Sequence, residues 1–129
     1  MASFNPTSTR AGRALQAWQI LVGHAMRRQT LTYNMLGNLM FDHGGAGVLN
    51  EILGCVAFFC DDNECPPLTV IVVNQESGEP GLQIPVERDE IDLLREKVFS
   101  FDWYDVVPPS VEELQASFDA RVRRENAGR

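Results

Sequence analysis

The stretch Pro67-Leu68-Thr69-Val70-Ile71-Val72-Val73 is the one on which the fold prediction depends. It is dominated by β-branched residues, which favour strands, and its nearly continuous apolar character is typical of a strand buried on both faces. Pro66 and Pro67 prevent a preceding helix from continuing into it. The sequence therefore predicts a buried strand over residues 68–73.

Upstream of this strand, apolar residues recur at helical spacing in three segments. They predict helices over residues 11–28, 33–41 and 46–60. Thr32 is placed to cap the second helix, and the turn before the third contains Asp42-His43-Gly44-Gly45. The N-terminal half is thus predicted to be a three-helix unit.

Downstream, a short return over residues 82–86 would complete a β-hairpin, and Pro85 confines that return to an edge. Two further helices are predicted over residues 87–99 and 111–124. Ser110 and Glu113 form a capping-box signature at the start of the last one.

An aromatic cluster lies between the last two predicted helices and comprises Phe99, Phe101, Trp103 and Tyr104. Such side chains form stacking platforms for bases in some nucleic-acid-binding proteins. The neighbouring Asp102 and Asp105 would repel a nucleic acid, so we interpret the cluster as a core clamp. We expect Trp103 and Tyr104, together with Val106 and Val107, to pack against the core.

The order of three helices, a β-hairpin and two helices is that of a winged-helix module. We therefore predict an α+β, mostly helical fold with a winged-helix-like three-helix core, a short β-hairpin and two C-terminal helices. The predicted organisation is a flexible arm over residues 1–10, a single domain over 11–125 and a tail over 126–129.

Composition sets the class of protein. The chain has 129 residues, of which 44% are hydrophobic, so it is long and apolar enough to bury a core without disulfides or metal. Its longest apolar runs are far shorter than a membrane span, and its first ten residues lack an apolar signal core. We expect a cytoplasmic protein that does not enter a membrane.

Charge is unevenly distributed along the chain. Residues 1–31 carry a net charge of +4, residues 32–119 carry −14, and residues 120–129 carry +3. Both ends would attract a polyanion, whereas the body would repel one.

No residue pattern predicts catalysis. Cys55, Cys60 and Cys65 are too widely spaced for a typical zinc site and are interpreted as buried or isolated thiols. Neither histidine has a partner nearby in sequence, and the P-loop lysine and spacing are missing after the glycines at 44, 45 and 47. We predict a non-enzymatic protein that uses no metal and no cofactor.

From Gln29 to Gly81 the chain resembles the DNA-binding segment of the O6-alkylguanine-DNA alkyltransferases and the alkyltransferase-like proteins. Leu31-Thr32-Tyr33-Asn34-Met35-Leu36 resembles the start of a helix in that family, and residues 46–54 stand where it has its recognition helix. Residues 67–72 resemble its proline-led approach to a buried strand, and Gly78 and Gly81 its later loop. The resemblance implies a winged-helix fold.

The departures from this family bear on function. Its reactive cysteine lies just after the buried strand, where this chain has Val73-Asn74-Gln75-Glu76. Asn74 then marks a vestigial nucleophile position, because an amide cannot accept an alkyl group as a thiolate does. The recognition-helix region from Asp42 to Asn63 contains no arginine or lysine, which disfavours DNA as a partner.

Two functions follow from these observations. The first is a non-catalytic winged-helix DNA-binding module, whose contacts would come from Arg10, Arg13, Arg27, Arg28, Tyr33, Asn50 and the C-terminal arginines. The second is a protein-interaction module, whose acidic body would bind a basic protein partner or mimic a nucleic acid. The sequence leaves both open, and it does not indicate an oligomeric state.

Overall fold

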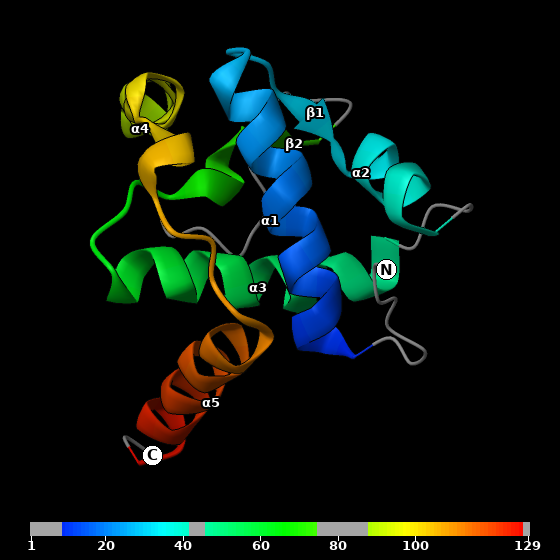
Figure 1. Cartoon of the computed structure of the whole chain (residues 1–129), viewed down its shortest axis with the longest axis vertical. Helices are drawn as coiled ribbons and strands as arrows, with labels where there is room; N and C mark the ends of the chain where they lie inside the picture. Colours follow the sequence, from blue (N-terminus) through cyan, green and yellow to red (C-terminus); the bar gives the residue numbers. More distant parts are fainter. Residues whose placement is uncertain (1–8, 42–45, 75–87, 128–129) are drawn as a thin grey trace.

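The computed structural model describes residues 9–41, 46–74 and 88–127, and this part of the chain is mostly helical (Figure 1). Its elements in chain order are α1 (Arg10–Met26), β1 (Leu31–Thr32), α2 (Tyr33–Phe41), α3 (Ala46–Asp62), the 3₁₀ turn η1 (Leu68–Ile71), β2 (Val72–Val73), α4 (Arg88–Ser100), the 3₁₀ turn η2 (Trp103–Asp105) and α5 (Val111–Ala127). The predicted α+β, mostly helical class is confirmed, and so are five predicted helices, with ends that differ by up to three residues.

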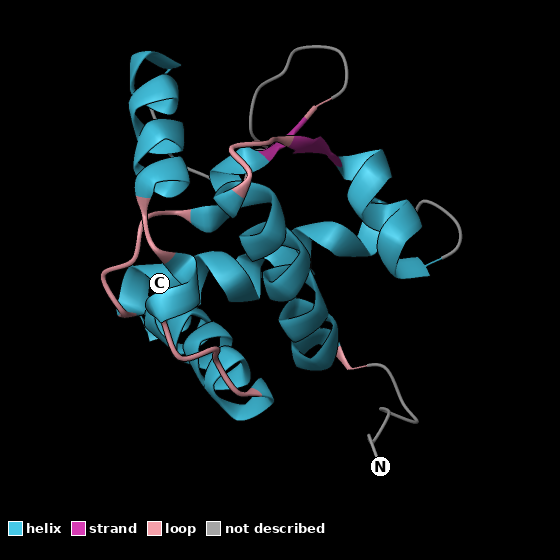
Figure 2. Cartoon of the chain, turned by 45° about the horizontal axis from the view of Figure 1, so that its top comes forward, coloured by secondary structure: helices cyan, strands magenta, loops and turns pink. Residues whose placement is uncertain are grey.

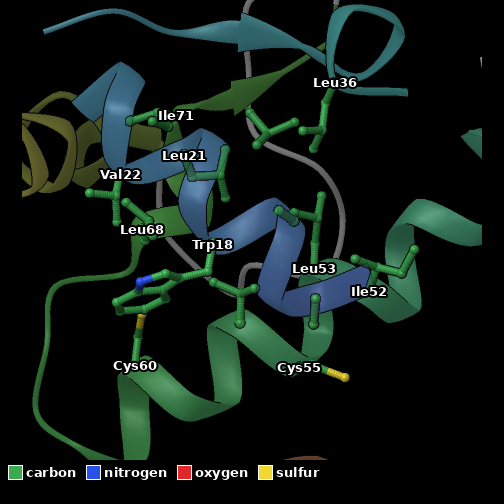
Figure 3. Packing of buried hydrophobic residues seen from close by; sticks show 14 of the residues in the cluster. Trp18, Leu21, Val22, Leu36, Ile52, Leu53, Cys55, Cys60, Leu68 and Ile71 are labelled. Carbon is green, nitrogen blue, oxygen red and sulfur yellow. The ribbon is translucent and has the colours of Figure 1, made fainter. Parts of the chain in front are cut away.

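Helix α1 lies at the centre of the core. Thr9 caps it, because its hydroxyl accepts a hydrogen bond from the Gly12 backbone N–H at 3.0 Å. The helix packs against α3 and η1, and it buries Ala14, Ala17, Trp18, Leu21 and Val22. Figure 3 shows Trp18, Leu21 and Val22 within this core. The cap at Thr9 starts the helix at Arg10, within the segment predicted to be an arm.

Helices α2 and α3 meet near the end of α2 and the start of α3 (Figure 2). The Thr32 hydroxyl accepts a hydrogen bond from the Met35 backbone N–H at 3.1 Å, so the predicted cap of α2 is confirmed. Helix α3 buries Leu49, Ile52, Val56 and Phe59. The ring of Phe59 meets that of Trp18 edge-on, with 5.5 Å between their centroids.

The strand predicted over residues 68–73 is wrong for most of its length. Leu68–Ile71 forms a 3₁₀ turn, in which the Val70 backbone N–H donates to the Pro67 carbonyl at 3.0 Å. A short apolar run indicates burial, but it does not distinguish a strand from a helical turn. This run is buried because α1, α3 and α4 all pack against it.

The last two residues of the run form β2, which pairs in parallel with β1 (Figure 2). Leu31 lies opposite Val72, and Thr32 lies opposite Val73. The sequence did not predict β1, because two residues are too few to show an alternating pattern. The predicted hairpin return at residues 82–86 and the turn at residues 42–45 lie outside the described residues, so the winged hairpin stays a prediction.

The segment between α4 and α5, residues 101–110, is called the connector below. Trp103 anchors it in the core, where its indole Nε1–H donates to the Val98 carbonyl at 2.8 Å. The Trp103 ring lies 5.6 Å from that of Trp18 and 4.6 Å from that of Phe101. The predicted core role of the aromatic cluster is confirmed for Trp103 and Phe101.

The same prediction is wrong for Tyr104 and Val107, which are 70% and 84% exposed. Trp103 and Tyr104 lie in a 3₁₀ turn, where the Val106 N–H donates to the Trp103 carbonyl at 3.2 Å. In such a turn successive side chains point in different directions, so burying Trp103 turns Tyr104 outward.

Helix α5 begins with the predicted capping box. The Glu113 N–H donates to the Ser110 hydroxyl at 3.1 Å, and the Ser110 N–H donates to the Glu113 carboxylate at 3.2 Å. The buried Leu114 and the partly buried Phe118 then face the core. This confirms the start of the last predicted helix.

Helix α3 is followed by Glu64, a non-glycine residue in the left-handed conformation, and substitutions there test this conformation. Glu64 has φ of 57°, and the Cys65 N–H donates to the Cys60 carbonyl at 2.9 Å, as in a Schellman cap. Because a Cβ is disfavoured in this conformation, we expect Glu64→Gly to raise the free energy of unfolding by about 0.5–1 kcal/mol. Urea unfolding measures the change.

Glu64→Ala is the matched control, since it removes the same carboxylate but keeps a Cβ at positive φ. We expect the glycine variant to be the more stable of the two. Equal stability of the two variants would contradict the left-handed cap.

Candidate functional site

The four arginines predicted as DNA contacts do not form one basic surface. Arg10 and Arg13 lie in the first turn of α1, whereas Arg27 and Arg28 follow its last turn. At 1.5 Å per residue, the two pairs are about 25 Å apart along the helix. A single phosphate-binding patch on α1 is therefore not formed.

Arg10 and Arg13 both have partners at the start of α1. Arg10 Nε donates to the Glu51 carboxylate at 3.1 Å, and its guanidinium lies 4.3 Å from the centroid of the Phe118 ring. Arg13 Nη1 donates to Gln16 Oε1 at 2.9 Å and to the Met40 carbonyl at 3.3 Å. These contacts hold both guanidinium groups against the protein surface.

Arg27 and Arg28 lie at the other end of α1. Arg27 is exposed at the C-cap, and Arg28 adopts the left-handed conformation, with φ of 57°. Arg28 forms an ion pair with Glu96 of α4, and its guanidinium lies 5.5 Å from the centroid of the Phe99 ring. Arg28 thus links α1 to α4.

The other predicted site residues are dispersed. Tyr33 is the first residue of α2 and packs partly against the core. Asn50 is exposed on α3, beside a shallow groove between α3 and α5. Asn74, at the position of the family's cysteine, is exposed directly after β2. These three residues lie on different elements.

Helix α5 packs against both α3 and α1. A Cβ added at Gly54 would lie 3.8 Å from the Phe118 ring, and the ring centroids of Phe58 and Phe118 are 6.0 Å apart. Arg121 bonds Asp61 at 2.8 Å, and Arg124 is 3.6 Å from Asp62. Residues Gly54, Phe58, Asp61 and Asp62 of α3 therefore lie against α5, whose arginines pair with the two aspartates.

The three cysteines are free thiols that burial keeps protonated. Burial is the main cause that raises the pKa of Cys55, to about 11, and the pKa of Cys60, to about 12. It also raises the pKa of Cys65. A raised pKa disfavours the thiolate, which is the nucleophilic form. Figure 3 shows Cys60 pointing toward Trp18 and Cys55 pointing away from it.

The connector combines exposed apolar and acidic side chains. Tyr104 and Val107 project into solvent, and Asp102 and Asp105 on either side of Tyr104 are exposed. Glu112 and Glu113 continue the acidic surface into the first turn of α5. Sequence reasoning missed this surface because it assigned the aromatic and valine residues to the core. The aspartates that alternate with those residues were the available signal.

No family model, curated protein or solved structure gives a significant match to this chain. Among the described residues, the helices are all too short or too polar to cross a lipid bilayer.

Proposed function

We propose that this chain is a non-enzymatic protein-interaction module, and that its connector binds a basic protein partner. The observation that carries the proposal is the exposure of Tyr104 and Val107 between acidic side chains. Exposed apolar residues that lie together mark interaction sites, and tyrosine is among the residues enriched at protein interfaces.

The connector is also held in a fixed shape. Trp103 is buried beside Tyr104 and is hydrogen-bonded to Val98, and the Asp105 N–H donates to the Asp102 carbonyl at 3.2 Å. A loop that is already ordered loses little conformational entropy when it binds. Tyr104 therefore suits the role of a preorganised anchor.

Charge supports a basic partner. Asp102, Asp105, Glu112 and Glu113 are all exposed around the two apolar residues. Lysine and arginine side chains on a partner would complement this surface and steer the encounter, and the effect would weaken in salt. A nucleic acid would be repelled from the same surface.

The raised pKa values of Cys55 and Cys60 support the non-enzymatic part of the proposal. Cysteine is the nucleophile that the resembled family uses, and thiols that stay protonated at neutral pH are poor nucleophiles. Asn74 offers no substitute at the family's position.

The proposal predicts that a nuclease-treated native lysate contains a basic protein that the immobilised chain retains. The double variant Tyr104→Ser, Val107→Ser should retain at least about tenfold less of this basic protein, because anchors of this kind dominate interface energies. Retention should also fall as salt is raised. Quantitative mass spectrometry of the eluates measures both effects.

Leu39→Ser is the matched control. Leu39 is 61% exposed on α2, outside the connector, so its replacement by serine also removes exposed apolar surface but leaves the connector intact. Equal retention by the connector variant and the control would contradict the proposal, and so would retention that disappears entirely on nuclease treatment.

DNA binding is a second candidate, favoured by one observation. The pairing of β1 with β2 joins the two segments on which the alkyltransferase resemblance mainly rests. In that interpretation Tyr33 and Asn50 would face DNA, with Arg10 at the backbone. A titration of labelled duplex DNA at low salt tests it, and binding at micromolar protein that weakens steeply with salt would favour this candidate over the first.

A further inference from the structure

A pocket opens between the start of α1, the end of α2 and the start of α3. Its volume is about 310 Å³, which is at the lower end of the range for sites that bind small molecules. The described residues that line it are Thr9, Arg10, Arg13, Phe41, Val48, Glu51 and Ile52. None of these residues belongs to the connector, so the pocket is a separate feature from the surface proposed to bind a partner.

One wall of the pocket is apolar. Ile52 is buried in its floor, and Phe41 is partly buried beside it. Val48 is 53% exposed at the pocket, which is unusual for a valine on a helix that is otherwise largely buried. A ligand with an apolar portion would cover Val48 and contact Phe41 and Ile52.

The opposite wall carries Arg13, whose guanidinium is fixed in place. Its carbon lies 4.7 Å from the centroid of the Phe41 ring, and its Nη1 donates to Gln16 and to the Met40 carbonyl. Its Nε is buried and has no hydrogen-bond partner among the described residues. A buried donor without an acceptor is costly, and an anion in the pocket would stabilise the positive charge of the same guanidinium.

The local charge favours an anion. Arg10 and Arg13 are one helical turn apart, and the first turn of α1 contains no acidic residue. Among the described residues of the lining, Glu51 is the one carboxylate, and it pairs with Arg10 while its side chain stays 65% exposed. An incoming anion would therefore compete with Glu51 for Arg10, whereas Arg13 pairs with no carboxylate of the described residues.

We propose that this pocket binds a small amphipathic organic anion. Its carboxylate or phosphate monoester group would bond Arg13 and Arg10, and its apolar portion would rest on Phe41, Val48 and Ile52. The guanidinium fork suits either oxyanion, so the chemistry of the charged group is left to the experiment.

The test is an NMR titration of the isotope-labelled chain with three probes. These are 4-phenylbutyrate, phenyl phosphate and the neutral control 4-phenylbutyramide. The anionic probes should shift the amide signals of the residues that line the pocket, with dissociation constants of about 1 mM, typical of fragments this small. The amide should shift them at least about tenfold more weakly, since it lacks the charge that the arginines recognise.

Two substitutions are expected to change the affinity for the anionic probes in opposite directions. Arg13→Gln should weaken the binding of the anionic probes about tenfold, because it removes the fixed cation. Glu51→Gln should strengthen it about threefold, because it removes the competing carboxylate. Arg123→Gln, an exposed arginine on α5 outside the pocket, should leave it unchanged.

The relative affinity of the two anionic probes identifies the preferred oxyanion. Binding of the neutral amide as tightly as 4-phenylbutyrate would overturn the proposal, and so would anion binding that Arg13→Gln and Arg123→Gln weaken equally. Shifts confined to residues outside the pocket would also overturn it. If Arg13→Gln fails to fold, the sign of the Glu51→Gln effect decides, because tighter binding is expected only when the anion lies beside residue 51.

Discussion

Replacing Trp103 with alanine is expected to lower the free energy of unfolding by about 3–5 kcal/mol. The side chain is almost fully buried, its indole N–H bonds the Val98 carbonyl, and its ring packs against Trp18. The truncation leaves a cavity and removes the shorter of two hydrogen bonds to the Val98 carbonyl, which keeps the one from the Phe101 N–H at 3.4 Å. Because a domain of this size has a total stability of about 5–15 kcal/mol, the loss is severe. Urea unfolding followed by circular dichroism measures it.

The neighbouring residue provides the control. Tyr104 is exposed, so Tyr104→Ala should change stability by less than about 0.5 kcal/mol. Trp103→Phe keeps a ring beside Trp18 but loses the N–H donor. Its loss in the free energy of unfolding should therefore lie between those of Trp103→Ala and Tyr104→Ala. Similar effects of alanine at 103 and 104 would contradict an inward tryptophan and an outward tyrosine.

Burial should make the thiols of Cys55 and Cys60 slow to react with an alkylating reagent. We expect iodoacetamide to alkylate native Cys55 and Cys60 at least about 100-fold more slowly than an unhindered thiol at a pH of about 8. Burial raises the pKa of Cys55 to about 11 and that of Cys60 to about 12, from an ordinary 9.0. Each unit lowers the thiolate fraction about tenfold at this pH, and only the thiolate reacts.

The alkylation rate should rise with pH, because the raised pKa values keep both thiols protonated at neutral pH. The rate at both cysteines should increase about tenfold for each pH unit up to a pH near 11 for Cys55 and near 12 for Cys60, as long as the chain stays folded. Peptide mapping by mass spectrometry gives the rate at each site, and concentrated guanidinium chloride should make the three cysteines react alike. Rapid labelling of Cys55 in the native chain at neutral pH would contradict a protonated thiol. It would support a catalytic role for this cysteine.

Most helices could be predicted because their signals are local. Helix α2 has the predicted bounds, and Thr32 caps it as the sequence indicates. The Ser110 and Glu113 capping box likewise locates the start of α5. Caps and apolar stripes depend on residues within one or two turns, so a sequence reveals them without tertiary information.

Two features could not be predicted because they depend on distant contacts. The run from Leu68 to Ile71 forms a turn between α1, α3 and α4, and its β-branched composition suggested a strand. Tyr104 and Val107 are exposed because the 3₁₀ turn that buries Trp103 directs the neighbouring side chains to solvent. Local composition specifies that these residues are apolar, whereas the packing of other elements decides which of them is buried.

The candidate site was predictable only in part. The arginine-rich start of α1 was visible in the sequence, but its pairing with Glu51 and the pocket beside Arg13 arise from residues about 30–40 positions apart. The placement of α5 against α3 likewise joins Arg121 to Asp61 across 60 positions. Neither contact leaves a periodic trace in the sequence.

The most direct test of the protein-interaction proposal is photo-crosslinking from the connector in native lysate. A benzophenone amino acid replaces Tyr104 in one sample and the similarly exposed Leu39 in another. We expect a crosslinked basic protein from position 104, reduced at high salt, and none of comparable yield from position 39. Crosslinks from position 39 alone, or products at position 104 that consist only of nucleic acid, would refute the proposal.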